Sequence, residues 1–356
     1  MSLKQLLGIE LPIIQAPMAG VQGSAMAVAV SNAGGLGSLP CAMLGFDALR
    51  QELAAIQAQT RHPYNVNFFC HAPPQVDATR EAAWRATLGP YYAEYGIDVG
   101  SIPAGPGRVP FSAEAADLLA EFRPPVVSFH FGLPAPALLA RIKSWGAKVL
   151  SSATTVDEAL WLQARGVDAI IAQGLEAGGH RGNFLSDDLS TQVGTLALLP
   201  QIVQAVRLPV IAAGGIANAQ GVAAALALGA VAAQVGTAYL LCPEASTSAL
   251  HRAALQGEAA RHTALTNLFT GRPARGIVNR VMRELGPMNA AAPAFPLAAA
   301  AIAPLRAKAE SAGSTDFSPL WSGQNASGCK AIAAGALTRE LAAGRARNVC
   351  DTGVRS

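Results

Sequence analysis

Short apolar runs alternate with longer amphipathic stretches along most of the chain. Each apolar run is followed by glycine or proline and then by a helical pattern, which predicts buried strands that alternate with helices. Thr155 is placed to cap one of these helices and Gly166 to end it. The predicted strands cover residues 12–18, 34–39, 63–69, 126–132, 148–154, 168–174, 209–215 and 232–239.

Eight strands separated by helices imply parallel pairing through right-handed crossovers. Eight is also the number of strands that closes into a (β/α)8 TIM barrel. A doubly wound open sheet is the alternative, and it would place a glycine fingerprint after the first strand. Here the glycines follow the sixth, seventh and eighth strands. The pattern therefore favours the α/β class and the barrel.

Two regions exceed a minimal barrel. Residues 70–125 form an insertion after the third strand, with a helical pattern followed by a loop rich in proline, glycine and aromatic residues. Residues 244–356 form a mostly helical C-terminal extension, interrupted by the non-helical stretch 313–324. We expect a barrel domain over residues 1–243 and an extension that acts as a lid, because a barrel's active site lies at the C-terminal ends of its strands.

One uncharged segment, residues 221–241, has the length of a transmembrane helix. Gly229 divides it into an alanine-rich helix and a β-like run, so we interpret it as a buried helix followed by a buried strand. No membrane association is expected.

Composition narrows the class of protein further. Of the 356 residues, 51% are hydrophobic and 14% are charged, which argues against disorder. The net charge of +3 without a basic block argues against a nucleic-acid partner. The five cysteines are scattered without a C-x-x-C motif, which indicates a reducing, cytoplasmic compartment and no zinc site.

In a barrel of this kind, functional groups should lie at the C-terminal ends of the strands, so the position of a residue along its strand indicates whether it can take part in catalysis. Lys148 opens its strand, so a Schiff-base aldolase is not expected. Glu176 is the one carboxylate at a plausible strand exit, whereas a divalent metal requires several ligands. Glycine, amide and imidazole groups remain, and they favour an organic cofactor.

Glycine-rich turns follow the last two strands, at Gly214-Gly215 and at residues 234–238. In barrels these two loops commonly bind phosphate, since glycine lets backbone N–H groups approach phosphate oxygens closely. Thr237 could add a hydroxyl group. The alternative is that the glycines only make a tight turn.

Two histidines are candidates for proton transfer or for binding an anionic oxygen. His130 belongs to the fourth strand, and His180 belongs to the glycine-rich loop "GLEAGGHRG" after the sixth. The alternative for His130 is a core histidine bonded to a backbone carbonyl. The remaining histidines are expected at the surface: His62, His71, His251 and His262.

Amide side chains at strand ends form a third group. Buried amides need hydrogen-bond partners, and they could bind a flat heterocycle such as a flavin or satisfy backbone groups instead. Nearby, Glu176 and Arg181 could pair with each other as scaffold. The four amides are Gln15, Asn67, Gln173 and Gln234.

At this point the chain resembles a known family. The motifs "QAPMAG", "SNAGGLGSL", "FHFGLP", "GLEAGGHRG", "PVIAAGGI", "QVGTAYL", "TGRPARGIVNR" and "DFSPLWSGQ" are similar to those of nitronate monooxygenases, formerly called 2-nitropropane dioxygenases. The resemblance covers most of the chain, and its motifs are more specific for the FMN-dependent barrel superfamily than for the reaction.

The resemblance implies FMN bound non-covalently at the strand ends, with the Pro17-Met18 segment beside the ring. It also implies that alkyl nitronates, notably propionate 3-nitronate, react with O2 through a flavosemiquinone to give a carbonyl compound and nitrite. His180 matches the family's active-site histidine, and His130 matches a second, substrate-facing histidine. The implied FMN contacts are Asn67, Gln173, Gly178, Gly215, Gln234, Val235, Gly236 and Thr237.

One segment departs from the family pattern. Some members place tyrosines and a lysine near the substrate in the C-terminal region, and residues 295–304 here contain neither. An NAD(P)H-dependent quinone or enoyl-thioester reductase on the same fold is the alternative function, and a non-catalytic sensor of a phosphate ligand is a third. The sequence leaves monomer and homodimer equally open.

Overall fold

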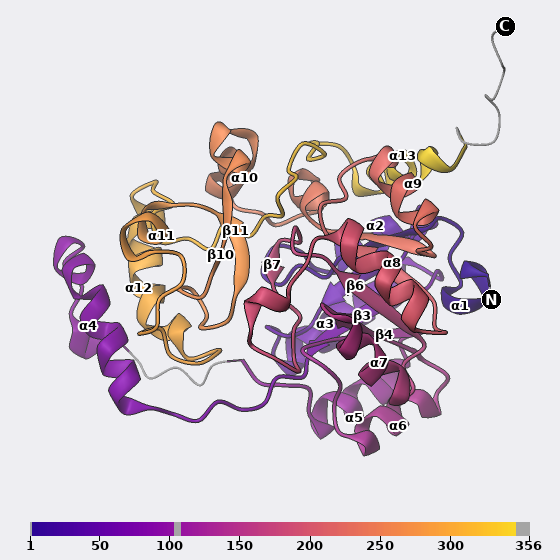
Figure 1. Ribbon diagram of the computed structural model, residues 1–356, viewed down its shortest axis with the longest axis horizontal. Helices are drawn as coiled ribbons and strands as arrows, with labels where there is room; N and C mark the ends of the chain where they lie inside the picture. The colour runs from indigo at the N-terminus through magenta and orange to yellow at the C-terminus, as the bar shows by residue number, and fades with distance from the viewer. Residues whose placement is uncertain (1, 103–107, 347–356) are drawn as a thin grey trace, which may run out of the picture.

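Eight parallel strands form the centre of the molecule (Figure 1). The computed structural model describes residues 2–102 and 108–346. The strand order is β1-β9-β8-β6-β5-β4-β3-β2, so each of the eight strands predicted from the apolar runs is confirmed. The strands are β1 (Ile13–Gln15), β2 (Gly37–Pro40), β3 (Tyr64–Phe69), β4 (Val126–His130), β5 (Lys148–Ala153), β6 (Ala169–Gln173), β8 (Val210–Ala213) and β9 (Ala232–Val235).

The sheet closes on itself where β1 meets β2. A parallel bridge joins Ile14 to Leu36, and the backbone N–H of Gln15 donates to the Leu36 carbonyl at 2.9 Å. Closure and the parallel order confirm the (β/α)8 barrel and exclude the open doubly wound sheet.

The strands are buried on both faces, as in other parallel sheets that helices cover. Between them run barrel helices, one of which, α7, has the predicted boundaries: Thr155 accepts a hydrogen bond from the Glu158 amide, and Gly166 follows the helix with a φ of +78°. The helices that follow seven of the strands are α2 (Ser24–Asn32), α3 (Phe46–Gln59), α5 (Ala113–Phe122), α6 (Pro136–Ser144), α7 (Val156–Ala164), α8 (Thr195–Ala205) and α9 (Ala219–Ala227). A short helix, α1 (Leu3–Leu7), precedes the barrel.

The uncharged segment 221–241 is divided as interpreted from the sequence. It forms most of α9, then β9, and ends in the 3-10 helix η3 (Thr237–Leu241). Across the described residues, no helix is long and apolar enough to cross a membrane.

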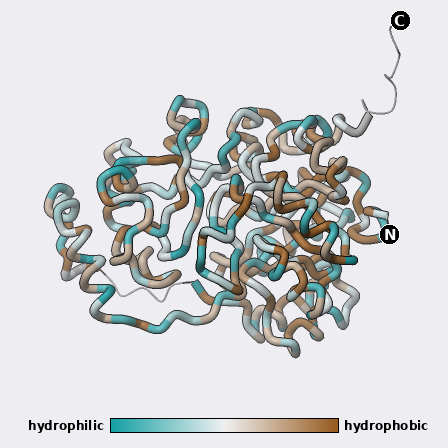
Figure 2. Tube along the Cα trace, in the orientation of Figure 1, coloured by the Kyte–Doolittle hydropathy of each residue, from teal (hydrophilic) through white to brown (hydrophobic). Residues whose placement is uncertain are grey.

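A second lobe lies beside the barrel and is built from both additions (Figure 1). The insertion contributes α4 (Ala78–Glu94) and η1 (Val99–Ser101), and the extension contributes α11 (Arg280–Leu285) and α12 (Ala298–Ser311). Trp84 of α4 donates to the Ala298 carbonyl at 3.2 Å, and Tyr92 donates to that of Ala301 at 2.7 Å. Figure 2 shows that hydrophobic residues gather more densely in the barrel than along α4.

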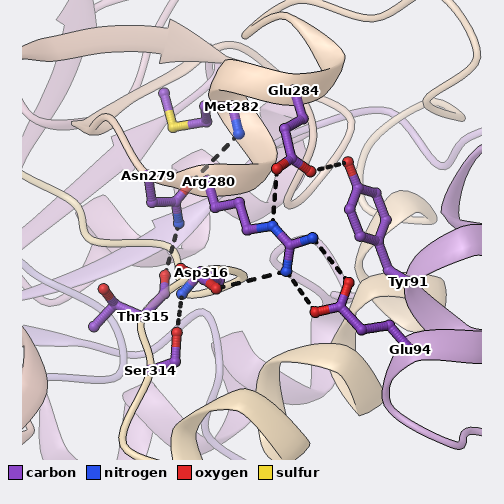
Figure 3. A network of polar contacts seen from close by, with 9 residues as sticks. All are labelled: Tyr91, Glu94, Asn279, Arg280, Met282, Glu284, Ser314, Thr315 and Asp316. Carbon is purple, nitrogen blue, oxygen red and sulfur yellow. Dashed lines mark hydrogen bonds and ion pairs between the residues drawn. The ribbon is translucent and has the colours of Figure 1, made fainter.

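Arg280 at the start of α11 ties the lobe's two parts together (Figure 3). Its guanidinium contacts Glu94 of α4 at 2.7 Å, Glu284 at 2.9 Å and Asp316 at 3.8 Å. Tyr91 of α4 donates to the second oxygen of Glu284 at 2.8 Å. The insertion is therefore attached to the extension by charge as well as by packing.

The extension also contains a small antiparallel sheet that the sequence pattern did not predict. Its strands are β10 (Thr263–Thr266) and β11 (Ala274–Ile277), and β7 (Gly179–His180) from the loop after β6 adds the third strand. The Arg181 amide extends this pairing by donating to the Pro273 carbonyl at 2.9 Å. This sheet fixes the backbone of His180 to the lobe. The 3-10 helix η2 (Leu189–Thr191) lies in the chain between β7 and α8. Helix α10 (Ala249–Gln256) and the 3-10 helix η4 (Glu258–Arg261) lie between η3 and β10.

The last helix of the barrel ring comes from beyond the lobe. Helix α13 (Ala334–Ala342), which continues into η5 (Ala343–Ala346), packs against α2, α9 and β1. The Thr338 and Tyr239 hydroxyl groups are 2.8 Å apart in this interface. The domain boundary at residue 243 stays a prediction, and the chain returns to the barrel after it.

Candidate active site

A cavity opens at the C-terminal ends of the barrel strands, and residues of the insertion and the extension, among them Arg108 and Trp321, complete its lining. Nine of the ten residues predicted for the site line it. Val235 is the exception, because its side chain is 1% exposed and packs in the barrel core with Ile13 and Met26. The nine are Asn67, His130, Gln173, Gly178, His180, Gly215, Gln234, Gly236 and Thr237.

Glycines after β8 and β9 bring backbone to the cavity surface. Gly214 and Gly215 have φ values of +122° and +69°, which side chains rarely adopt. A Cβ atom on Gly178 would lie 2.5 Å from the Gly323 nitrogen, so only glycine fits this close approach. The Thr237 hydroxyl oxygen accepts a hydrogen bond from Gly323 at 2.9 Å, which leaves the hydroxyl hydrogen to donate. Residues of the extension thus close against the glycine turns.

Gln234 provides a direct test of whether the cavity suits a polar heterocycle. Its side-chain oxygen is buried, and within the described residues it has no hydrogen-bond partner. A buried acceptor without a partner is costly, and the side chain lines the cavity beside Gly236. An N–H donor of a bound ring would satisfy it, and a flavin carries such a donor.

The other amides have assigned partners. Gln173 donates to the His180 carbonyl at 3.0 Å and accepts from the Gly182 amide at 2.7 Å, which holds the loop in place. Asn67 donates to the Ser128 hydroxyl at 2.9 Å. Gln15, in contrast, is bonded to Gln22 inside the barrel and does not line the cavity. Its role is therefore to satisfy the scaffold.

His180 lies among aromatic rings with one nitrogen anchored. Its Nε2 is 2.9 Å from the Thr270 hydroxyl, and its ring centroid is 5.3 Å from that of Phe295 and 5.6 Å from that of Trp321. Burial holds the pKa of His180 well below its usual value, and the positive charge of Arg108 lowers it further. The imidazole is therefore neutral at neutral pH.

His130 has both ring nitrogens engaged. Its Nδ1 is 3.0 Å from the Ser152 hydroxyl, and its Nε2 is 3.2 Å from the His180 carbonyl. Burial lowers the pKa of His130 to about 4. The bond to a backbone carbonyl is the feature of the core alternative, although the side chain also lines the cavity. Its substrate-facing role stays a prediction.

The pairing of Glu176 with Arg181, which the sequence left open, is absent from the described ion pairs. Arg181 is fully buried and donates to Gln192 and to the carbonyls of Gln173 and Gly174. Glu176 instead accepts from the amide and hydroxyl of Thr195 at the start of α8. Each group therefore fixes a different part of the loop after β6.

Two histidines predicted at the surface are buried, with 6% of each side chain exposed. His71 follows β3, and its Nε2 is 3.0 Å from the Arg108 carbonyl. His251 lies on the apolar face of α10, one turn before the buried Leu255, and lines the cavity. That spacing was a signal in the sequence that the polar surroundings of His251 concealed.

Charge is distributed unevenly around the cavity. Among the described lining residues, Arg108 is the one side chain that carries a full charge, and no aspartate or glutamate lines the cavity. Nothing in the sequence around Arg108 indicated this position. The cavity is therefore electropositive, which favours anionic ligands.

A closed barrel with glycine turns, imidazole and a covered cavity at its strand ends defines a class, the (β/α)8-barrel enzymes that react at this face. Within that class the chain belongs to the nitronate monooxygenase family, a family of oxidoreductases whose model matches residues 1–344. The resemblance seen in the motifs is confirmed.

Individual relatives agree over nearly the whole chain. The nitronate monooxygenase of Paraburkholderia phytofirmans is 44% identical over 96% of this chain and 93% of its own length. That of Pseudomonas aeruginosa is 42% identical over 95% of this chain and 97% of its own. The crystal structure of a nitroalkane oxidase from Streptomyces ansochromogenes is 39% identical, covers 97% of this chain and 99% of its own, and superposes with a TM-score of 0.87.

Proposed function

We propose that this protein oxidises alkyl nitronates, such as propionate 3-nitronate, with O2 to a carbonyl compound and nitrite, using FMN. The observation that carries the proposal is the pairing of a neutral His180 with the cationic Arg108 in a cavity whose described lining has no carboxylate. A nitronate is an anion, and such a cavity attracts it without requiring a strong base.

FMN fits the groups at the strand ends. The backbone at Gly214, Gly215 and Gly236, with the Thr237 hydroxyl, would hold the phosphate, and Gln234 would accept from the ring. Bound there, FMN supplies the capacity to accept a single electron. Gly178 lets Gly323 of the extension approach the loop that carries His180, because a Cβ atom at Gly178 would lie 2.5 Å from the Gly323 nitrogen.

The role of His180 follows from its tautomer. Thr270 can accept a hydrogen bond from Nε2–H, which leaves Nδ1 as a base, or donate to Nε2, which leaves Nδ1–H as a donor. A neutral nitroalkane needs the base, whereas a nitronate needs only the donor. Both tautomers are uncharged forms of the imidazole, since the lowered pKa of His180 keeps the ring from becoming an imidazolium.

The overall reaction balances with oxygen alone. Two nitronate anions and one O2 give two carbonyl compounds and two nitrite ions, so each new carbonyl oxygen is an atom that O2 supplies in the sum. The rings of Phe295 and Trp321 beside His180 suit this chemistry, because apolar surroundings strengthen the interactions with the anion.

The test is an aerobic assay of the purified protein with propionate 3-nitronate, following nitrite release and oxygen consumption together. We expect nitrite to form only with bound FMN and with O2 present. The opposite pattern is bleaching of the flavin by NADH under anaerobic conditions with none by nitronate. It would refute the proposal in favour of an NAD(P)H-dependent reductase.

The same proposal includes a reducing, cytoplasmic location. Its support is that the cysteines in the described part of the chain are free thiols, namely Cys41, Cys70, Cys242 and Cys329.

A further inference from the structure

Arg108 is held at the cavity wall in a fixed position. Its backbone carbonyl is 3.0 Å from Nε2 of the buried His71. Its guanidinium carbon lies 5.9 Å from the ring centroid of Phe69 and 5.6 Å from that of Phe295. Two aromatic faces therefore support the cation where it lines the cavity.

The other buried or half-buried arginines near the site donate hydrogen bonds to the protein itself. Arg181 donates to Gly174 and Gln173, Arg275 donates to Leu175, and Arg272 donates to the Asn183 carbonyl. Within the described residues, the Arg108 guanidinium forms neither an ion pair nor a hydrogen bond. A half-buried cation without such partners is costly unless a ligand provides them.

Arg108 and His180 reach the cavity from segments that are far apart in the sequence. Arg108 comes from the insertion between β3 and β4, whereas His180 comes from β7, next to the glycines Gly178 and Gly179. Both side chains contact the rings of Phe69 and Phe295, His180 at centroid distances of 6.1 and 5.3 Å. One small substrate can therefore contact both side chains, with its reacting end at His180 and its other end at Arg108.

We propose that Arg108 is the specificity-determining residue of this site and binds an anionic tail of the substrate, a carboxylate distal to the reacting nitronate carbon. This inference rests on the proposed function. A guanidinium presents paired N–H donors that match the two oxygens of a carboxylate. The same interaction orients the substrate, since it fixes the end that does not react.

Two nitronates of equal length test the assignment. Propionate 3-nitronate carries the carboxylate, and propyl 1-nitronate has a methyl group in its place. For Arg108→Gln we expect KM for propionate 3-nitronate to rise about 10- to 100-fold, as for loss of a charge-assisted hydrogen bond, with kcat nearly unchanged. KM for propyl 1-nitronate should rise only slightly, because for this substrate Arg108→Gln removes no more than the general attraction of a cationic cavity for the nitronate anion. Arg108→Lys should recover part of the discrimination because it keeps the charge.

Arg272→Gln is the matched control, because Arg272 is also stacked on a ring, at 4.2 Å from that of Phe131, but does not line the cavity. It should alter both substrates to the same extent. An equal rise in KM for both nitronates in Arg108→Gln would place the nitronate itself on the guanidinium and overturn the proposal, and so would no change in either.

Binding without turnover separates this inference from the proposed function. Calorimetric titration with 3-nitropropionate and with 1-nitropropane, without O2, should show tighter binding of the carboxylate in the wild type and equal binding in Arg108→Gln. Equal binding in the wild type would refute the role of Arg108. Absence of nitronate turnover in the wild type, with the carboxylate preference intact, would refute only the proposed reaction. A thermal melt and the flavin content of each variant establish that it is folded.

Discussion

Replacing His180 with alanine should separate two substrates that differ by one proton. A neutral nitroalkane must lose a carbon-bound proton before oxidation, and a positioned general base contributes about 10²- to 10⁴-fold to such a step. The corresponding nitronate has already lost that proton, and the imidazole gives it one hydrogen bond to an anion. Loss of such a bond corresponds to about 10- to 100-fold. His180→Ala should therefore reduce turnover of nitroethane far more than turnover of ethylnitronate.

The lowered pKa of His180 moves the contribution of the base toward the lower end of its range, about 10²-fold, and for nitroethane this factor adds to the loss of the hydrogen bond that both substrates share. The lowered pKa makes neutral His180 a weak base, and Thr270 anchors only its Nε2, so Nδ1 remains for the substrate. The assay is kcat/KM from nitrite release with both substrates in wild type, His180→Ala and His180→Gln. The glutamine variant keeps a hydrogen-bond donor and should retain more nitronate activity than the alanine variant. Equal losses on nitroethane and ethylnitronate in His180→Ala would refute a role as base.

Three further outcomes follow from the structure. Gly178→Ala should lower the flavin content of the purified protein severalfold, because its Cβ would lie 2.5 Å from the Gly323 nitrogen, whereas Gly45→Ala, with open space around it, should leave absorbance at 450 nm unchanged. The free energy of unfolding should decrease as the pH is lowered from 6.5 to about 4. Burial lowers the pKa of His130 and His251 to about 4 in the folded state, so the unfolded state binds more protons in this range. Melting temperatures that stay constant from pH 7 to pH 5 would contradict this. Arg280→Met should lower the melting temperature by a few degrees at low ionic strength and less in 1 M salt, since the ion pairs with Glu94 and Glu284 are partly exposed; a loss independent of salt would indicate that packing is responsible.

The barrel could be predicted because its signals are local. Each strand is a short run of buried residues, and the caps of α7 are written in Thr155 and Gly166. Glycines after the last two strands mark where backbone must approach a ligand, and the structure places them on one cavity. Position within a barrel then selected His130 and His180 from six histidines.

What could not be predicted depends on contacts between distant segments. Strand β7 has two residues and exists only because β11 pairs with it across the lobe. His71 and His251 are buried where the insertion and the extension fold over the barrel, and a helical pattern within one segment does not specify which distant segment covers it. Arg108 can be recognised as a candidate binding residue only from two features of the folded structure. Aromatic rings lie beside its guanidinium, and the described lining of the cavity contains no carboxylate.

The position of α13 changes what the lobe is in topological terms. The lobe's main segment leaves the barrel after β9 and the chain returns to supply α13, the helix that packs between α2 and α9. It is thus a long loop between the last strand and the last helix of the ring, not an appendage. Cutting the chain at residue 243 would expose the apolar surface of the barrel that α13 covers. It would also remove the contact between the Thr338 and Tyr239 hydroxyl groups. A minimal barrel would have to join η3 directly to α13. The segment that covers the cavity therefore cannot be removed by simple truncation without losing a helix of the barrel.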